Sequence, residues 1–317
     1  MTNPTPAGPE KRALRIGTRG SELALWQAHT VQRLLKEQGI GTEIEIIKTR
    51  GDRIDDVPFS KLEGKGFFTK ELEDAQLEGR VDFAVHSLKD LTTEEPPGLT
   101  LAAMIGREDP REILLARPGA IDEEKLKAGE ILPLIQGANL GTSAARRQAQ
   151  AHLLRPDLEI LDLRGNVPTR VQKLRDGKYD AILLARAGIL RLELKLDDLA
   201  AIPLDVDRFV PPPAQGMLGI QCRDEAILVK TLQSLHCPVD GSAVGAERLL
   251  LQRLDGGCQL PFGVNIRSRD NDWKLELFLA ENSEGGSALR LCLTGDSPLA
   301  VAEQAWQKVQ KHKRSLR

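Results

Sequence analysis

Between residues 14 and 185 the sequence alternates between strand-like and helix-like segments, and this alternation constrains the fold more than any other feature. Residues 14–17 form a short apolar strand candidate, and Ser21 is a suitable N-cap for a helix with apolar residues at helical spacing. Residues 42–48 then alternate charged and apolar side chains, as a strand does. Such alternation predicts an α/β fold with largely parallel sheets, whose ligands lie beyond the carboxyl ends of the strands.

The same pattern predicts the elements that follow. In a first unit we expect a helix at 69–78 and strands at 81–85 and 99–105, and in a second unit we expect strands at 113–116, before Gly141, at 158–163 and at 179–185, with helices at 143–154 and 167–175. Three prolines at 211–213 interrupt the chain, and 218–222 is typical of one more buried strand. We predict that this late strand returns to the first sheet, so that the chain crosses between the two units twice.

The pattern changes at about residue 238. A helix at 241–254 precedes three alternating strands near 264–269, 273–280 and 288–293, and a last helix at 298–311 carries one apolar face made of Leu299, Ala302, Trp306 and Val309. This order predicts a small α+β domain with a three-stranded antiparallel sheet. The domain limits that we predict are a disordered tail at 1–12, a first domain at 13–107 and 214–234, a second domain at 108–213 and a third domain at 238–317.

Charge and composition exclude several classes of function. The chain has 44 Lys and Arg against 46 Asp and Glu, so nothing in its overall charge favours nucleic acid or an anionic membrane. Aromatic residues make up only 3%, which leaves few platforms for stacking bases. The start of the chain lacks the apolar core of a signal peptide, and no apolar run is long enough for a spanning helix. We therefore expect a cytoplasmic protein that binds neither nucleic acid nor membrane.

Basic residues gather in one part of the chain. Residues 141–191 contain ten Lys or Arg against five Asp or Glu. Arg146 and Arg147 enter a helix just after Thr142 and Ser143, and Arg164 follows a strand. Arginines at strand ends and helix starts can bind carboxylates or phosphates with paired hydrogen bonds, so the pattern favours a ligand with several negative groups. The alternative is a set of ordinary surface arginines with acidic partners.

Three further features carry possible chemistry. Lys89 and Asp90 end a strand, where Asp90 could exchange protons and Lys89 could hold an anion, although a surface ion pair has the same sequence. His86 is better explained as a structural histidine. None of the four cysteines forms a CxxC pair, so we expect neither a disulfide framework nor a metal site. Cys258 follows two glycines that leave its sulfur approachable, as a nucleophile or an attachment point requires, whereas the other three cysteines resemble packing residues.

Seven motifs in order resemble one known family over nearly the whole chain. They are Ile16–Gln27, Gly64–Glu73, Val85–Asp90, Gly141–Gln148, Leu163–Arg170, Gln215–Ile220 and Gly256–Pro261. The sequence is similar to the porphobilinogen deaminases, also called hydroxymethylbilane synthases. The resemblance implies a three-domain, monomeric transferase of tetrapyrrole biosynthesis, whose first two domains resemble periplasmic binding proteins. It also implies that four porphobilinogen molecules are joined head to tail, with release of ammonia, into a linear hydroxymethylbilane.

The resemblance assigns roles by motif. A dipyrromethane cofactor would be bound by a thioether to Cys258, and Asp90 would be the catalytic carboxylate. Every pyrrole of this family's substrate carries an acetate and a propionate, which accounts for the basic residues. The positions that match cofactor-binding residues are Lys89, Asp90, Thr142, Ser143, Arg146, Arg147, Arg191 and Gln215. The positions that match substrate-binding residues are Arg19, Ser21, Arg164 and Arg170, and Phe68 matches the aromatic residue of a loop over the site.

Departures from the family pattern are modest. Ala144 and Ala145 replace a more usual Ser-Leu pair, Pro168 lies inside the motif at 163–170, and Gly20 stands where Gln or Lys is common. None removes a charge or the thiol. Two other functions remain open from the residues: a non-catalytic binding protein for a small polycarboxylate, and a nucleic-acid module. The lack of an export signal and the approachable Cys258 argue against the first, and the scarcity of aromatic residues argues against the second.

Overall fold

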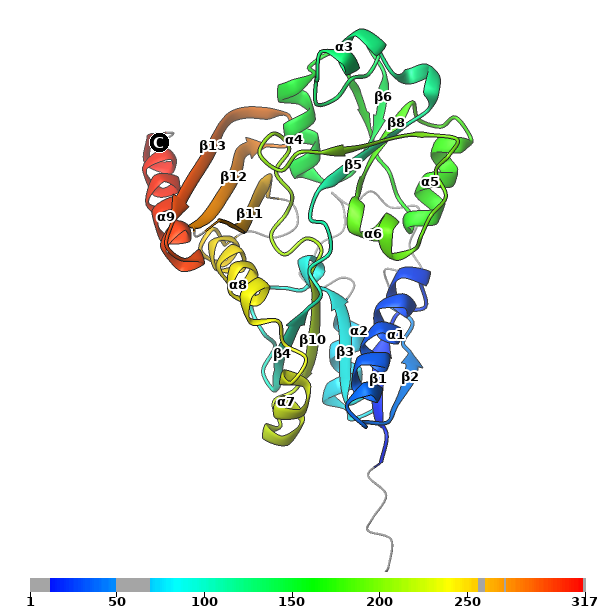
Figure 1. Cartoon of the computed structure of the whole chain (residues 1–317), viewed down its shortest axis with the longest axis vertical. Coiled ribbons are helices and arrows are strands. Elements are labelled where there is room, and N and C mark those ends of the chain that lie inside the picture. The colour runs from blue at the N-terminus through cyan, green and yellow to red at the C-terminus, as the bar shows by residue number, and fades with distance from the viewer. Residues whose placement is uncertain (1–11, 50–68, 256–259, 271, 316–317) are drawn as a thin grey trace, which may run out of the picture.

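The computed structural model describes residues 12–49, 69–255, 260–270 and 272–315. Its first sheet has the strand order β2-β1-β3-β10-β4 (Figure 1). These strands are β1 (Leu14–Thr18), β2 (Thr42–Ile46), β3 (Phe83–Ser87), β4 (Leu99–Ile105) and β10 (Leu218–Arg223). The helices packed with them are α1 (Glu22–Glu37), α2 (Lys70–Leu77) and α7 (Ala226–Gln233). Only β10 runs against the other four described strands of this sheet, since it pairs antiparallel with both β3 and β4.

The second sheet repeats this plan with the order β7-β6-β8-β5-β9. Its strands are β5 (Glu112–Ala116), β6 (Asn139–Gly141), β7 (Glu159–Leu161), β8 (Ala181–Ala185) and β9 (Ala200–Leu204). The helices of this region are α3 (Glu123–Lys127), α4 (Ala145–Leu154), α5 (Val167–Arg175) and α6 (Arg186–Arg191). Here β5 is the strand of opposite direction. Each sheet thus receives its reversed strand directly after the chain has crossed from the other sheet.

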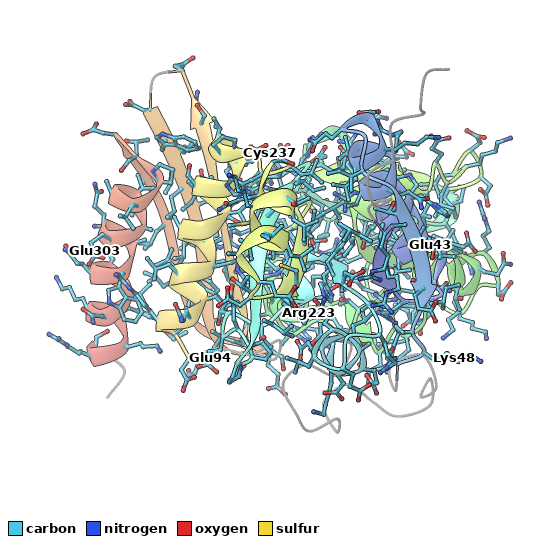
Figure 2. The ribbon with its side chains drawn as sticks, turned by 90° about the horizontal axis from the view of Figure 1, so that it is seen from below. Glu43, Lys48, Glu94, Arg223, Cys237 and Glu303 are labelled. Carbon is cyan, nitrogen blue, oxygen red and sulfur yellow. The ribbon has the colours of Figure 1, made fainter. Side chains whose placement is uncertain are left out.

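The third part of the chain forms a three-stranded antiparallel sheet with two helices. The strands are β11 (Phe262–Arg269), β12 (Asp272–Asn282) and β13 (Gly285–Gly295), and the helices are α8 (Pro238–Arg253) and α9 (Pro298–Ser315). Helices α8 and α9 both pack on this sheet. In the view from below, α9 is the helix that carries Glu303, and α8 lies on the side of the first sheet, whose β4 it contacts (Figure 2). The predicted fold class is therefore confirmed, including the double crossover and the small antiparallel sheet.

Local sequence explains where the helices near the two sheets begin. The Ser21 hydroxyl accepts a hydrogen bond from the amide of Ala24 and caps α1, whose buried face includes Val31 and Leu35. Asn166 caps α5 in the same way. Pro168 falls in the first turn of α5, where a helix needs no amide donor, so this departure from the family motif fits the helix.

The chain passes from the first sheet to the second at residues 106–111 and returns at residues 205–217, and these two crossings lie against each other. The amide of Glu108, in the first crossing, donates to the carbonyl of Gly216, in the second, at 2.9 Å. Gly216 has a φ of +86°, and a Cβ there would lie 2.1 Å from the carbonyl oxygen of Glu108. The carboxylate of Glu247 on α8 is fully buried; it accepts from Arg107 at 2.7 Å and from the amide of Ala214 at 2.8 Å. Helix α8 is thereby bonded to both crossings.

Several details differ from the sequence-based predictions. Strand β9 and helix α6 were not predicted; β9 is an edge strand, which is why it tolerates Pro203. Strand β3 begins two residues later than expected, after Asp82, whose carboxylate accepts from the amide of Arg15. Leu299 is 60% exposed, because the buried face of α9 is formed by Val301, Ala302, Ala305 and Val309. Cys292 is also exposed and is no packing residue, since the flanking leucines of β13 point inward. The domain limits stay a prediction.

Candidate active site

Predicted site residues follow the carboxyl ends of two neighbouring strands in the first sheet. Arg19 and Ser21 come directly after β1, and Lys89 and Asp90 form a short 3-10 turn with Leu88 after β3. Asp90 is exposed and Lys89 is half-buried. Since β1 and β3 are parallel neighbours, their carboxyl ends meet at one edge of the sheet.

The corresponding edge of the second sheet carries the other predicted residues. Thr142 and Ser143 follow β6, whereas Arg146 and Arg147 lie in the first turn of α4. The Ser143 hydroxyl is bonded to both backbone groups of Leu163, which ties the loop after β6 to the loop after β7. Ala144, the N-cap residue of α4, supplies no side-chain acceptor. The first-turn amides of α4 therefore lack the usual cap and suit a bound anion.

Glu112 is a site residue that sequence reasoning missed. It is the first residue of the reversed strand β5, so it lies at the same edge as the carboxyl end of β8 and is completely buried. Its carboxylate accepts hydrogen bonds from Arg146 and, at 2.7 Å, from Arg147. Burial would raise the pKa of Glu112, but the guanidinium groups of Arg147 and Arg146 lower it to about 2. Glu112 thus stays ionised and orients both arginines.

Both arginines of this pair also donate hydrogen bonds to backbone carbonyls. Arg146 also donates to the carbonyl of Val210 at 2.8 Å, and Arg147 to that of Leu183 at 2.8 Å. Burial lowers the pKa of Arg146 to about 10. Within the described part of the chain, the Nε of Arg147 is buried and has no hydrogen-bond partner. One carboxylate between two guanidinium groups leaves a surplus positive charge, so this cluster suits an anionic ligand.

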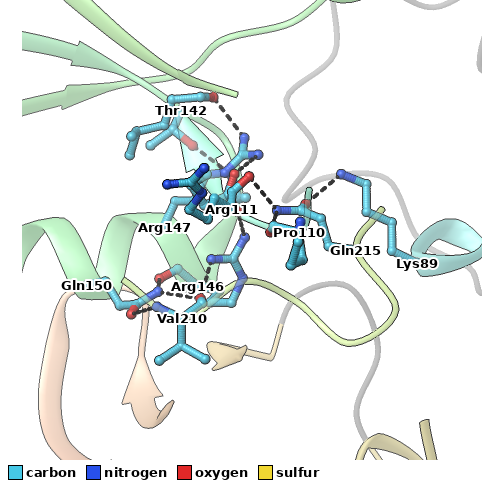
Figure 3. A network of polar contacts seen from close by, with 12 residues as sticks. Lys89, Pro110, Arg111, Thr142, Arg146, Arg147, Gln150, Val210 and Gln215 are labelled. Carbon is cyan, nitrogen blue, oxygen red and sulfur yellow. Dashed lines mark hydrogen bonds and ion pairs between the residues drawn. The ribbon is translucent and has the colours of Figure 1, made fainter. Parts of the chain in front are cut away.

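Lys89 joins the two sheets through Gln215. Its ammonium group donates to Oε1 of the fully buried Gln215 at 3.0 Å, and Nε2 of Gln215 donates to the carbonyl of Pro110 at 2.8 Å (Figure 3). Burial lowers the pKa of Lys89, Asp90 raises it, and Arg147 lowers it again. Gln215 therefore connects the Lys89 turn to both crossings, and the charges of the arginine pair in the second sheet act on Lys89.

Arg170 extends this cluster toward Asp90. Burial, together with the charges of Arg147 and Arg164, lowers the pKa of Arg170 to about 10, although the charge of Asp90 raises it. The Nε of Arg170 donates to the carbonyl of Gly165 at 2.7 Å. The charge of Asp90, from the first sheet, therefore acts on Arg170 of α5, which the charges of Arg147 on α4 and of Arg164 in the loop before α5 also affect.

Arg191 does not belong to the arginine cluster described above, and its side chain is hydrogen-bonded to both crossings. Its guanidinium group donates to the carbonyls of Gly106 and Gly216 and stacks on the ring of Trp26 of α1, with 5.4 Å between the guanidinium carbon and the ring centroid. Its Nε is buried without a hydrogen-bond partner among the described residues. Burial lowers its pKa to about 10. Besides the cofactor contact predicted for it, Arg191 holds the two sheets at their junction.

Polar residues also lie at the end of β3, next to the site. The amide of the buried Gln27 donates to the hydroxyl of Ser87 at 2.7 Å, which fixes the last residue of β3 before Lys89. Ser87 lies inside the motif at 85–90, so this motif was the sequence signal that could have identified it.

His86 is buried, and burial lowers its pKa to about 4 while Gln221 hydrogen-bonds to it. The imidazole of His86 is therefore neutral and packed, as expected for a structural histidine.

Two predicted site residues, Phe68 and Cys258, lie outside the described residues. Helix α8 ends at Arg253, and the described chain continues to Asp255, three positions before Cys258. Among the described residues, no group of three or more His, Cys, Asp or Glu could hold a metal ion. No described helix is long and apolar enough to cross a membrane.

Fold and site together define a class of protein: two α/β units joined by two crossings, with basic side chains and one exposed carboxylate where their sheet edges meet. Sequence comparison then gives the family. The model of the family "Porphobilinogen deaminase, dipyromethane cofactor binding domain" matches residues 14–231, and the chain belongs to the porphobilinogen deaminase family. It is a transferase of tetrapyrrole biosynthesis with hydroxymethylbilane synthase activity, porphobilinogen as its substrate and a dipyrromethane cofactor.

Curated relatives agree with the family model. The porphobilinogen deaminase of Geotalea daltonii is 43% identical over 296 residues, which cover 92% of this chain and 88% of the relative. That of Sulfurimonas denitrificans is 46% identical over 263 residues, covering 82% and 81%. Among solved structures, the periplasmic VFT2 domain of BvgS from Bordetella pertussis aligns with 70% of this chain and 86% of its own at 12% identity and a TM-score of 0.41.

Proposed function

We propose that each round of condensation takes place between the sheet edges, with Asp90 as the catalytic carboxylate and Cys258 as the attachment point of the cofactor. The observation that supports this most is the position of Asp90 in the turn after β3, next to Lys89, which is hydrogen-bonded through Gln215 to the crossing into the second sheet; the charge of Asp90 also acts on Arg170 of that sheet. The protein works as a monomer in the cytoplasm. A non-catalytic polycarboxylate-binding protein would use the arginines but has no need of Asp90 beside them.

The described residues fit the dipyrromethane, which supplies a free pyrrole position to which the next unit is added. Each of its two pyrroles carries two carboxylates, and the site offers orphaned, buried donors in the Nε atoms of Arg147 and Arg191. The uncapped start of α4 adds backbone amides to these donors. Cofactor carboxylates would be held by Lys89, Thr142, Ser143, Arg146, Arg147, Arg191 and Gln215.

Asp90 acts on the incoming substrate. Loss of ammonia from porphobilinogen leaves positive charge on the pyrrole, and a fixed carboxylate beside it lowers the energy of that state. The same carboxylate can hold the pyrrole N–H and move a proton to or from it. Arg19, Ser21, Arg164 and Arg170 receive the acetate and propionate groups of the substrate and the growing chain.

The attachment point is tested by the intact mass of the freshly purified protein. We expect a mass above that of the polypeptide by two pyrrole units, and we expect Cys258→Ser to remove this adduct together with the activity. Cys292→Ser is the matched control, because Cys292 is an exposed thiol in the described chain and should keep the full adduct. An adduct that persists in Cys258→Ser, or a bare polypeptide mass in active protein, would contradict the assignment.

A further inference from the structure

Arg248 on α8 makes three hydrogen bonds to the backbone around Asp90. Its guanidinium group donates to the carbonyls of Leu88 at 3.3 Å, Leu91 at 3.1 Å and Thr92 at 2.7 Å. The carbonyl of Leu88 also accepts the hydrogen bond from the amide of Leu91 that closes the 3-10 turn, and Leu91 and Thr92 are the two residues that follow Asp90. The guanidinium group therefore fixes the backbone on both sides of Asp90 without touching its carboxylate.

Apolar contacts hold the same turn against α8. Val244, one helical turn before Arg248, is fully buried in a cluster with Leu88 and Leu91. Glu247, the residue before Arg248, bonds the crossings through Arg107 and Ala214. One face of α8 thus contacts both the Asp90 turn and the two crossings, in agreement with its place beside the first sheet in Figure 2.

Helix α8 also leads toward Cys258. It ends at Arg253, five positions before that cysteine, so the helix that contacts the Asp90 turn through Arg248 is also the helix that precedes the proposed attachment point in the sequence. A displacement of about 1 Å between reacting groups can cost about a hundredfold in rate. The separation of Asp90 from the tethered chain consequently depends on how firmly α8 holds the turn.

We propose that Arg248 is a positioning residue of the condensation reaction, which holds the turn of Asp90 in a fixed place against α8. This proposal rests on the proposed function of Asp90 and Cys258. Removal of the three hydrogen bonds lets the turn move relative to α8, and the main effect falls on turnover, because the residues that receive the substrate carboxylates lie elsewhere.

The test compares Arg248→Met, which keeps the length of the side chain, with Arg248→Lys, which keeps a donor. We expect Arg248→Met to lower kcat about 10- to 100-fold, with KM changed less than about threefold. The adduct on Cys258 should stay complete by intact mass, and Arg248→Lys should recover part of kcat. Arg253→Met is the matched control on the same helix, since Arg253 pairs with Glu303 of α9, and it should leave kcat unchanged.

A double-mutant cycle separates positioning from general stabilisation. If Arg248 acts through Asp90, Arg248→Met should cost little further kcat in an Asp90→Asn background, whereas independent effects would multiply. An unchanged kcat in Arg248→Met, or a full multiplicative loss in the double variant, would overturn the proposal. If Asp90→Asn itself keeps normal kcat, the proposed function of Asp90 fails instead, so the two failures are distinguishable.

Discussion

Replacement of Asp90 by asparagine is expected to lower kcat by roughly a hundred- to ten-thousand-fold while the protein stays folded. Asparagine keeps the size of the side chain but carries no charge to oppose the positive charge that develops as ammonia leaves. Asp90 is exposed at the end of its turn, so its replacement empties no part of the core. Release of ammonia from porphobilinogen, measured beside the urea unfolding midpoint, checks both parts of this expectation.

Asp224→Asn is a suitable control, because Asp224 is an exposed aspartate that follows β10 in the same sheet and lies far along the chain from the motif at 85–90. It should leave both kcat and the unfolding midpoint close to those of the parent protein. Near-normal turnover in Asp90→Asn would remove this carboxylate from the mechanism, and a large shift of the unfolding midpoint would show that its role is structural.

Gly216→Ala is expected to cause the largest loss of stability, roughly 3 kcal/mol or more in the free energy of unfolding. Two causes act together: the φ of +86° is strained for alanine, and the new Cβ would lie 2.1 Å from the carbonyl oxygen of Glu108. Backbone atoms can yield only if the crossings separate, which would also break the 2.9 Å hydrogen bond from Glu108 to Gly216. Urea unfolding of the full chain measures the loss.

Gly106→Ala separates these two causes. Gly106 has a φ of +57°, but a Cβ there would meet nothing within 4 Å, so only the backbone strain of about 1–2 kcal/mol should appear. The difference between the two variants isolates the close contact of the crossings. Equal losses in both would mean that the second crossing has room to move and does not hold the two sheets at a fixed junction.

Most of the fold could be predicted because its signals are local. Ser21 and the helical spacing of Val31 and Leu35 define α1, and the alternation of apolar and charged residues predicts β2 and the three C-terminal strands. Strand β9 was missed because Pro203 is a poor strand residue, and only its position at the sheet edge makes it acceptable.

The site was predictable to the extent that its residues follow strand ends. Lys89, Asp90, Arg146 and Arg147 all lie at such positions, and the rule for α/β sheets brings them to one region. The pairing of both arginines with Glu112 was not predictable, because it depends on the reversed direction of β5, which places the first residue of that strand at the ligand edge. A sequence pattern predicts where strands lie along the chain, but it does not predict the direction in which each strand runs within its sheet.

Incubation of the protein with porphobilinogen, followed by intact-mass analysis and mapping of the modified peptide, tests the central claim most directly. The account predicts a series of covalent species that grow by one porphobilinogen less one ammonia at each step, all on the peptide that contains Cys258. Formation of hydroxymethylbilane without any covalent series, or a series attached to another residue, would contradict it.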